Sequence, residues 1–386
     1  MDFELSAEQK EIQAVTRDFV RAEIEPHAAK WDREHHFPRD VFAKLGELGL
    51  MGVCLPEEYG GAGSDFLSYM LVIEELSRGD AGVGVTVAVH TSAVTLPLLR
   101  FGTDEQRARF VPPLARGELI GAFALTEAEA GSDAGSLRTS ATREDGGWRI
   151  VGAKQFISTA EYAGTFLLFA RTDPDTPGAR GISAFVLDAD HIRVTGSEEK
   201  LGLNSSTTNS IAVDVRVDAD RLLHEEGKGF HIAMATLDGG RIGIAAQAVG
   251  IAQAAYDVAR EYAKERHAFG RPIAEFQAIQ HKLADMSTEI DAARLLVHRA
   301  AWLKQNDQPH TEAGAKAKLF ASEMARRQTG EAIQILGGYG YTKEFPVERY
   351  YRDAKITEIY EGTSEIQRLV IARSILGLQE RALAQG

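Results

Sequence analysis

The sequence predicts an α+β protein of several domains, in which a helical domain, a central antiparallel β-barrel or sandwich and a C-terminal four-helix bundle follow one another. Three observations support this fold class. Apolar residues recur at helical spacing over residues 1–118, β-branched and aromatic runs alternate with turns over 119–227, and helical spacing returns over 228–386. A chain of 386 residues is long enough for two or three domains with buried cores, so we place the domain boundaries at these positions.

The N-terminal segment begins with a helix signal, because Ser6 and Gln9 have the spacing of a capping box. We expect this helix to run through Phe19 and Ile24 and to end at Pro26, since proline interrupts a helix interior. Further helices are expected over residues 39–48 and 66–76 and, in buried surroundings, over 82–99, where the valines leave a strand as the alternative. The segment is therefore expected to consist of helices.

The central segment has the features of short strands. Runs of β-branched and aromatic residues occupy 122–125, 148–151, 166–170 and 183–187, and residues 211–217 alternate apolar with polar side chains. Residues 145–147 and 174–178 are rich in Asp, Gly and Pro, which predicts hairpin connections. Strands joined in this way predict a small antiparallel barrel or sandwich.

The C-terminal segment repeats a three-four spacing of apolar residues and alanines, with one seam over residues 242–263 and a second over 283–300. A third helix is expected over 311–336, ending at the glycine pair that follows, and a fourth after Glu361. One apolar seam per helix is typical of near-antiparallel helices, and the alanines allow these helices to approach closely. The sequence therefore predicts a four-helix bundle.

Composition excludes several classes of protein. The formal net charge of -13 argues against a general nucleic-acid binder and against binding to an anionic membrane. No apolar run approaches membrane-spanning length without interruption by Gly, Thr, His or Arg. The sequence contains no HExxH pattern, no pair of cysteines and no Walker loop, so we predict neither a metal site nor nucleotide hydrolysis.

The cellular compartment is inferred from two features. The single cysteine, Cys54, excludes an intrachain disulfide and fits a reducing compartment. The N-terminus is acidic and amphipathic, unlike a secretory signal or an Arg-rich transit peptide. We therefore expect a cytoplasmic (bacterial) protein, or a protein of an organelle matrix whose transit peptide has been removed.

One short stretch places an acidic residue, Glu361, between an aromatic ring, Tyr360, and a glycine, Gly362. Ser364 and Gln367 follow at capping-box spacing, so a helix is expected to begin there. A sharp turn at Gly362 could then point the carboxylate of Glu361 into a cavity, where it could act as a base. The alternative is an acid that stabilises the positive end of the helix, and the stretch alone favours this second interpretation.

Four further motifs allow a ligand-binding role beside a structural one. Residues 125–133 and 154–159 carry hydroxyl and small side chains at strand ends, which could hydrogen-bond the edge of a heterocycle or form surface turns. The two arginines nearest the helix end within 265–272 could hold a pyrophosphate or complement the helix dipole. Asp238 and Arg241 could form a surface ion pair or face a ligand.

Taken together, these motifs resemble the acyl-CoA dehydrogenase family, and most closely its short-chain, butyryl-CoA branch. The resemblance covers essentially the whole chain. It rests on five motifs in a fixed order, which are residues 125–133, residues 156–158, Arg266 with Phe269 and Gly270, residues 334–338, and residues 360–363. Each motif alone is weak, whereas all of them in order are specific. The family has the same helical, β, helical domain order that the residues predict, and the resemblance implies FAD as cofactor.

The resemblance implies that Glu361 is the catalytic base. It would remove the α-proton of an acyl-CoA thioester while a hydride passes from the β-carbon to N5 of the flavin, which gives a trans-2-enoyl-CoA. In the family, the thioester oxygen is polarised by the backbone N–H of the base and by a ribityl hydroxyl of FAD, and such hydrogen bonds stabilise the developing enolate. We expect burial to raise the pKa of Glu361 toward a value that suits a general base.

The resemblance also assigns residues to the two ligands. The residues expected to bind FAD are Phe123, Leu125, Thr126, Gly131, Ser132, Phe156, Ile157, Ser158, Arg266, Phe269, Gln277, Gln334, Ile335, Gly337, Gly338, Thr363 and Glu365. The residues expected near the acyl-CoA substrate are Ser132, Asp238, Arg241, Tyr360 and Gly362. Some FAD contacts are expected to cross a subunit interface in a homotetramer, a dimer of dimers. Electrons are expected to pass to an electron-transferring flavoprotein.

Two departures from the family pattern bear on these assignments. A branch of the family carries its base near Asp238, and the matching residue here is Gly240, which has no side chain. Glu361 is therefore the only candidate of the two. Phe156 stands where many members have Trp beside the flavin, which could alter flavin packing or partner docking but removes no catalytic group.

Three alternatives stay open. A flavin oxidase on the same scaffold would pass electrons to oxygen, and a dehydrogenase for branched short acyl groups would share these motifs. A non-catalytic relative that binds nucleic acid or acts as a scaffold is expected to be basic and to lack the base, whereas this chain is acidic and keeps Glu361. Acyl length and branching depend on side chains from several helices, which the sequence does not place in space.

Overall fold

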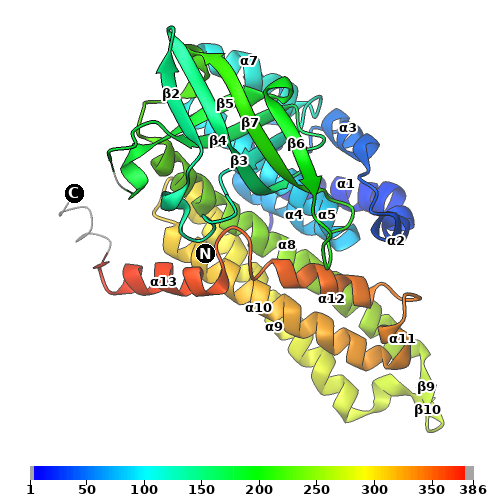
Figure 1. Cartoon of the computed structure of the whole chain (residues 1–386). Helices are drawn as coiled ribbons and strands as arrows, with labels where there is room; N and C mark the ends of the chain where they lie inside the picture. The colour runs from blue at the N-terminus through cyan, green and yellow to red at the C-terminus, as the bar shows by residue number, and fades with distance from the viewer. Residues whose placement is uncertain (1–3, 177, 379–386) are drawn as a thin grey trace.

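The computed structural model describes residues 4–176 and 178–378, and it shows a helical part, a sheet and a second helical part in chain order (Figure 1). The predicted fold class is confirmed. Pro177, which belongs to the turn predicted over 174–178, lies outside the described residues.

The N-terminal part is built of helices joined by turns and loops, as predicted. Its elements are α1 (Ala7–Phe19), the π-helical η1 (Val20–Ile24), α2 (Glu25–Glu34), α3 (Arg39–Glu47), α4 (Phe66–Gly79), α5 (Ala81–Ala88), the π-helical η3 (Val89–Thr95), α6 (Leu96–Phe101) and α7 (Asp104–Ala115). The capping box of Ser6 and Gln9 is present, with side-chain to backbone hydrogen bonds of 2.9 and 3.1 Å. The helix does not end at Pro26, however. Pro26 lies in the first turn of α2, where its missing N–H leaves no intrahelical bond unmade.

The prediction that no apolar run approaches membrane-spanning length is wrong for two helical segments. Ala81–Phe101 and Gly229–Glu265 are long and apolar enough to cross a membrane by length and composition. In each case most of the apolar window, 89% and 78% respectively, is buried inside the protein. These are therefore core helices, and the apolar surface that satisfies the criterion is covered by the rest of the chain.

The central sheet has eight strands in the order β6-β7-β3-β2-β4-β5-β8, with β1 paired to β4. They are β1 (Gly121–Ala124), β2 (Ser140–Glu144), β3 (Gly147–Ser158), β4 (Thr165–Arg171), β5 (Ile182–Asp188), β6 (Ile192–Ser197), β7 (Thr208–Asp218) and β8 (Leu222–Leu223). The prediction of antiparallel pairing is wrong for two contacts, because β1 and one residue of β2 pair with β4 in parallel. Strands β2, β6 and β8 were not predicted, since β2 and β6 are mostly exposed and polar and β8 has two residues.

Strands β4 and β5 are buried on both faces. On one face Phe166 and Phe185 pack against Trp148 of β3, whose ring lies 5.4 Å from that of Phe185 in an edge-on arrangement. On the other face Leu167 and Val186 pack into a second core with the helices of the N-terminal part. The sheet therefore bends over its own core and is fixed against the helices by its opposite face.

The C-terminal part is built around three long helices. These are α8 (Gly229–Glu265), α9 (Gln277–Gln305) and α10 (Thr311–Leu336), followed by the shorter α11 (Gly338–Tyr341), α12 (Val347–Ile356) and α13 (Ser364–Ile375). A small hairpin of β9 (His267–Ala268) and β10 (Arg271–Pro272) joins α8 to α9 at the end of the bundle away from the sheet (Figure 1). Helix α13 packs on α10 as the predicted fourth helix, and α12 packs on both α8 and α10. The apolar core is continuous from α4 into this bundle.

Helices α4 and α8 approach each other closely at Gly250. A Cβ atom built on Gly250 would overlap the backbone oxygen of Glu74 and would lie 3.0 Å from the Cβ atom of Ser77. Glycine is therefore required here by the distance between two helices, even though it weakens a helix by about 1 kcal/mol relative to alanine.

We predict that Gly250→Ala lowers the free energy of unfolding by about 1–3 kcal/mol, because the added methyl group must push α4 and α8 apart. The matched control is Gly330→Ala in α10, where the new Cβ would meet only the Tyr351 ring at an ordinary 3.7 Å. The control is expected to be neutral or stabilised by up to about 1 kcal/mol. Denaturant titration of both variants measures the difference, and equal stabilities would contradict the prediction.

Candidate active site

Glu361 lies in a tight turn between α12 and α13. Glu361 has φ 50° and Gly362 has φ 89°, so two successive residues adopt the left-handed conformation. This conformation is free for Gly362 but costs about 1–2 kcal/mol for Glu361, which contacts of the turn must offset. The helix that follows begins one residue earlier than predicted, because Thr363 rather than Ser364 caps it and accepts a hydrogen bond of 3.3 Å from the backbone of Ile366.

Three side chains from the surrounding helices and the turn itself fix its backbone. Lys318 of α10 donates a hydrogen bond of 2.6 Å from Nζ to the carbonyl oxygen of Gly362. Gln367, expected to complete a capping box, instead donates from Nε2 to the same oxygen at 2.8 Å. The hydroxyl of Tyr360 is bonded to Oε1 of Gln247 on α8. These contacts to α8, α10 and α13 compensate for the strained conformation of Glu361.

The carboxyl group of Glu361 is enclosed without a partner. The residue is half-buried, and its Oε2 atom is buried and makes no hydrogen bond in the described part of the chain. Burial raises the pKa of Glu361 to about 7, against the opposing positive charges of Lys318 and Arg241. The expectation of a raised pKa is thus supported, and the group is able to exchange a proton near neutral pH.

Gly240 of α8 forms the floor beneath this carboxyl group. A Cβ atom built on Gly240 would overlap Oε2 of Glu361 and would lie 2.8 Å from its Cδ. The absence of a side chain at position 240 therefore does more than remove a second acid. It leaves the space in which the Glu361 carboxyl group sits.

Asp238 and Arg241 form the ion pair that their spacing allows, with 2.5 Å between Oδ1 and the guanidinium. Asp238 also accepts a hydrogen bond of 2.7 Å from the hydroxyl of Thr311. Arg241 is 5% exposed, and its Nε atom has no partner among the described residues. The predicted ion pair is present, although Arg241 is buried and the pair is not on the surface, and Arg241 also acts electrostatically on Glu361.

The strand-end segments 125–133 and 154–159 lie side by side. The backbone N–H of Gln155 donates to the carbonyl oxygen of Thr126 at 2.9 Å. Beneath them, the buried Lys154 donates to Glu127 at 2.8 Å and to the backbone of Leu125 at 3.1 Å. Burial lowers the pKa of Lys154 to about 8. Sequence reasoning assigned no role to Lys154 or Glu127, although a lysine within a strand of alternating burial is the signal that could have found them.

These segments present the surface expected of a site for a planar heterocycle. Phe156 lies at the irregularity of β3 between Lys154 and Ile157, has φ 60° and is 58% exposed, so its aromatic ring is open to solvent. Gly131 and Ser132 are exposed, and a Cβ atom built on Gly131 would meet nothing within 4 Å. Phe123 packs beneath, with its ring 5.1 Å from that of Phe169. An exposed ring beside an open glycine turn fits an isoalloxazine ring, so the residues present are compatible with FAD.

The other residues assigned to FAD lie at the far end of the bundle. They are Arg266, Phe269, Gln277, Gln334, Ile335, Gly337 and Gly338, from the ends of α8 and α10, the start of α9 and the β9–β10 hairpin (Figure 1). Phe269 is 95% exposed, and Arg266 lies over the ring of Tyr339 at 5.8 Å. From Gly240 to the end of α8 the helix rises about 38 Å at 1.5 Å per residue. One chain therefore does not bring this group to the Glu361 turn.

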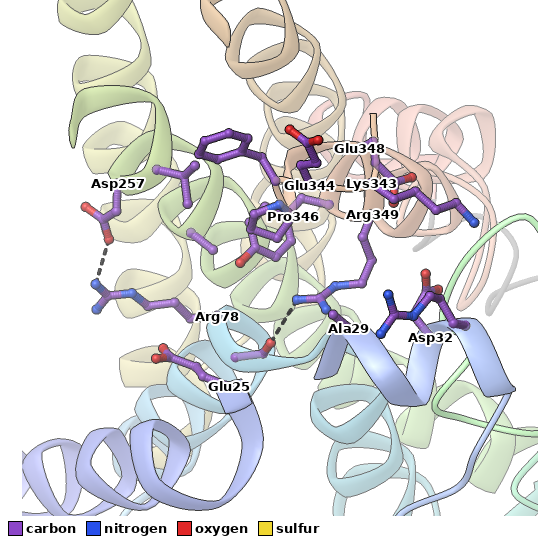
Figure 2. Close-up of a pocket in the computed structure, with 16 residues that line it drawn as sticks. Glu25, Ala29, Asp32, Arg78, Asp257, Lys343, Glu344, Pro346, Glu348 and Arg349 are labelled. Atoms are coloured by element: carbon purple, nitrogen blue, oxygen red, sulfur yellow. Dashed lines mark hydrogen bonds and ion pairs between the residues drawn. The ribbon is translucent and has the colours of Figure 1, made fainter. Parts of the chain in front are cut away.

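A separate cavity of about 410 Å³ lies between α2, α4, α8 and α12, away from the Glu361 turn (Figure 2). Its acidic and basic side chains are mixed: Glu25, Asp32, Asp257, Glu344 and Glu348 stand against Arg33, Arg78, Lys343 and Arg349. Arg78 is paired with Asp257 at 2.6 Å, as the dashed line in Figure 2 shows. This near balance of charge favours neither an anionic nor a cationic ligand.

Comparison with known proteins agrees with this geometry. Three family models match, described as the N-terminal, middle and C-terminal domains of acyl-CoA dehydrogenase, over residues 6–118, 122–215 and 227–376. The chain belongs to the acyl-CoA dehydrogenase family. It is an FAD-dependent enzyme that acts on acyl-CoA, as the resemblance implied.

Three similar proteins illustrate the match. The short-chain specific acyl-CoA dehydrogenase of Clostridium acetobutylicum is 48% identical over 378 residues, which is 97% of this chain and 100% of the relative. The butyryl-CoA dehydrogenase structure from Megasphaera elsdenii superposes with a TM-score of 0.96 at 44% identity, covering 97% of this chain and 100% of that chain. A structure described as the electron transferring flavoprotein of Acidaminococcus fermentans contains a chain that matches with a TM-score of 0.96 at 46% identity, with the same coverage.

We predict that Gly240→Ala displaces the Glu361 carboxyl group. Because misplacing a catalytic group by about 1 Å lowers rates, flavin reduction by acyl-CoA should fall by roughly tenfold or more, while FAD stays bound. Stopped-flow absorbance of the flavin measures the rate, and the flavin spectrum measures occupancy.

The control for stability is Gly243→Ala, one turn further along α8, where the new Cβ would lie 3.8 Å from its nearest neighbours. It should gain up to about 1 kcal/mol of stability from helix propensity, whereas Gly240→Ala should not. If Gly240→Ala reduces its flavin at the wild-type rate, the added methyl group does not displace the Glu361 carboxyl group and the prediction is wrong.

Proposed function

We propose that this enzyme converts a short-chain acyl-CoA to the trans-2-enoyl-CoA, with Glu361 as the base that removes the α-proton. The observation that carries the proposal is the buried, unpartnered Oε2 atom of Glu361. Burial raises the pKa of this carboxyl group to about 7, so a large fraction is ionised at neutral pH and still basic enough to accept a proton. The short-chain assignment is supported by the relatives whose names specify short-chain and butyryl-CoA substrates.

The turn supplies a second element of the reaction. The α-proton of a thioester becomes acidic when hydrogen bonds to the carbonyl oxygen stabilise the developing enolate. In the proposed mechanism the backbone N–H of Glu361 donates one of these bonds. The left-handed φ of Glu361 sets how this N–H is oriented in the turn that also carries the carboxyl group. FAD, when bound, supplies the acceptor for the hydride that leaves the β-carbon.

The residues that bind the ligands are proposed in two groups. Phe123, Leu125, Thr126, Gly131, Ser132, Phe156, Ile157, Ser158, Thr363 and Glu365 hold the flavin end of FAD in the same chain as the base. Ser132, Asp238, Arg241, Tyr360 and Gly362 contact the acyl-CoA. Support comes from the open surface at Phe156 and Gly131 and from the ion pair beside the Glu361 turn.

The second group of FAD residues acts on a neighbouring subunit in this proposal. Arg266 and Phe269 follow the end of α8, about 38 Å of helix beyond Gly240. The end of α10 at Gln334 lies about 24 Å of helix beyond Lys318, which contacts the Glu361 turn. The group is Arg266, Phe269, Gln277, Gln334, Ile335, Gly337 and Gly338. The exposure of Phe269, at 95%, fits contact with a second copy of the chain. We therefore propose a homotetramer, a dimer of dimers, in which these residues complete the cofactor site of a partner.

The electron acceptor that we propose is an electron-transferring flavoprotein. Support comes from the matching chain in the structure described as the electron transferring flavoprotein of Acidaminococcus fermentans, which is 46% identical to this chain.

We predict that Glu361→Gln keeps its yellow FAD and binds butyryl-CoA but loses flavin reduction by roughly 10²–10⁴-fold, the range for a general base. The amide has nearly the same shape and cannot accept the proton. The matched control is Glu344→Gln, an exposed residue before α12 that should keep the wild-type rate. Anaerobic stopped-flow mixing with butyryl-CoA and with branched acyl-CoAs measures the rates. Rapid bleaching of the flavin in Glu361→Gln would remove Glu361 from the mechanism.

We predict that Arg266→Ala weakens FAD retention at least tenfold, because a guanidinium at the end of α8 would no longer contact the cofactor. Arg260→Ala, at a half-buried arginine of α8 that is paired with Glu261, is the control and should retain FAD. Flavin content after dilution and gel filtration measures retention. A full flavin complement in Arg266→Ala would assign Arg266 to the protein surface alone.

A further inference from the structure

Lys318 is buried beside the Glu361 turn. It lies on α10, is 0% exposed, and places its Nζ atom 2.6 Å from the carbonyl oxygen of Gly362. Within the described residues this nitrogen has no carboxylate within 4.0 Å. A buried ammonium is costly, by several kcal/mol, unless its surroundings compensate for the lost water. Burial of Lys318 on the alanine-rich face of α10 therefore needs compensation, and one hydrogen bond to a carbonyl oxygen compensates for only a small part of the cost.

The electrostatic surroundings supply that reason. Lys318 is the first of the two cations that lower the pKa of Glu361, and Glu361 is the first of the groups that raise the pKa of Lys318. Burial lowers the pKa of Lys318 to about 8. Because each group favours the charged form of the other, formation of the Glu361 carboxylate favours the protonated form of Lys318.

The other charged or titratable groups near this pair are already compensated or neutral. From α8, Arg241 faces Glu361 but is held by Asp238 at 2.5 Å. From the turn and α13, Glu358 and Glu365 act on Lys318, and Glu358 is paired with Arg326 and Lys355. Burial raises the pKa of Tyr69 and Tyr360, which also lie near Glu361, so both stay neutral. Among these groups, Lys318 is thus the cation without a competing ion pair.

We propose that Lys318 is a positioning residue of the reaction: its ammonium holds the Gly362 carbonyl in the left-handed turn and provides the charge against which the Glu361 carboxylate forms. It touches no reacting atom and acts through Glu361. This inference rests on the proposed role of Glu361 as the base. It assigns two separable effects to one side chain, a hydrogen bond that orients the turn and a charge that sets the protonation of the base.

The test replaces Lys318 by methionine and by glutamine. Lys318→Met removes both the hydrogen bond and the charge, whereas Lys318→Gln removes the charge and keeps a donor. Removing a cation disfavours the ionised carboxyl group, so the pKa of Glu361 rises and the acid limb of the rate profile moves to higher pH. We expect a shift of about one pH unit or more in both variants. At pH 7 the rate of flavin reduction should fall about fivefold from this shift alone. At high pH the limiting rate should be recovered in Lys318→Gln, which keeps a hydrogen-bond donor, but not in Lys318→Met.

Two readouts are needed. The first is the pH dependence of flavin reduction by butyryl-CoA, and the second is infrared difference titration of the carboxyl group, which requires no turnover. The band absent from Glu361→Gln identifies Glu361 in these spectra. The matched control is Lys316→Met, two residues away on α10, which replaces a lysine paired with Glu312 at 2.5 Å. This variant should leave the midpoint of the pH–rate profile and the midpoint of the infrared titration unchanged. A purely structural effect of replacing a lysine on this helix should also leave both midpoints unchanged.

The outcomes separate this inference from the proposed function. If Glu361→Gln is inactive and both Lys318 variants titrate at the wild-type midpoint, the role of Lys318 is overturned and the base assignment stands. If Glu361→Gln turns over normally, the proposed function fails first. If only Lys318→Gln folds, its midpoint decides. If neither variant folds, Lys318 is a residue of the fold and the inference is overturned.

Discussion

The rest of the site depends on one close contact, in which the Glu361 carboxyl group packs directly against the backbone of α8 at Gly240. A side chain at position 240 would occupy the space of the Oε2 atom. To reach this place, the chain between α12 and α13 adopts two left-handed residues in succession. The turn is stable only because α8, α10 and α13 each contribute a hydrogen-bonding side chain to it. The bundle thus acts as the support for one strained turn.

A second constraint is the balance of charge inside the bundle. Burial alone would keep Glu361 protonated, and two nearby cations alone would keep it ionised. The pKa of about 7 results from these opposing effects, neither of which is visible in the residues next to Glu361 in the sequence. The cations come from α8 and α10, 120 and 43 positions earlier in the chain. The pKa that suits Glu361 to act as a base therefore depends on the packing of the whole bundle.

Much of the fold was predictable because it follows from apolar periodicity. The helix expected over 311–336 has those bounds in the structure, and the long apolar segment from residue 82 is helical and buried. Two predictions of helix ends failed because a local signal was assigned to the wrong position in the helix. Pro26 begins a helical turn instead of ending one, and Thr363 caps α13 because the turn before it places Ser364 inside the helix. The role of Lys318 was not predicted, because nothing in the sequence around this lysine indicates that it contacts Gly362, 44 residues further along the chain.

The buried pair of Lys154 and Glu127 has a consequence for the energetics of the cofactor site. Glu127 also accepts hydrogen bonds from the backbone of Arg138 and Thr139, at 2.6 and 2.9 Å, so both ends of the loop over 127–139 are fixed by bonds internal to the chain. A loop that is ordered by its own scaffold loses little conformational entropy when a ligand arrives. Its contribution to affinity is therefore pre-organised before FAD binds.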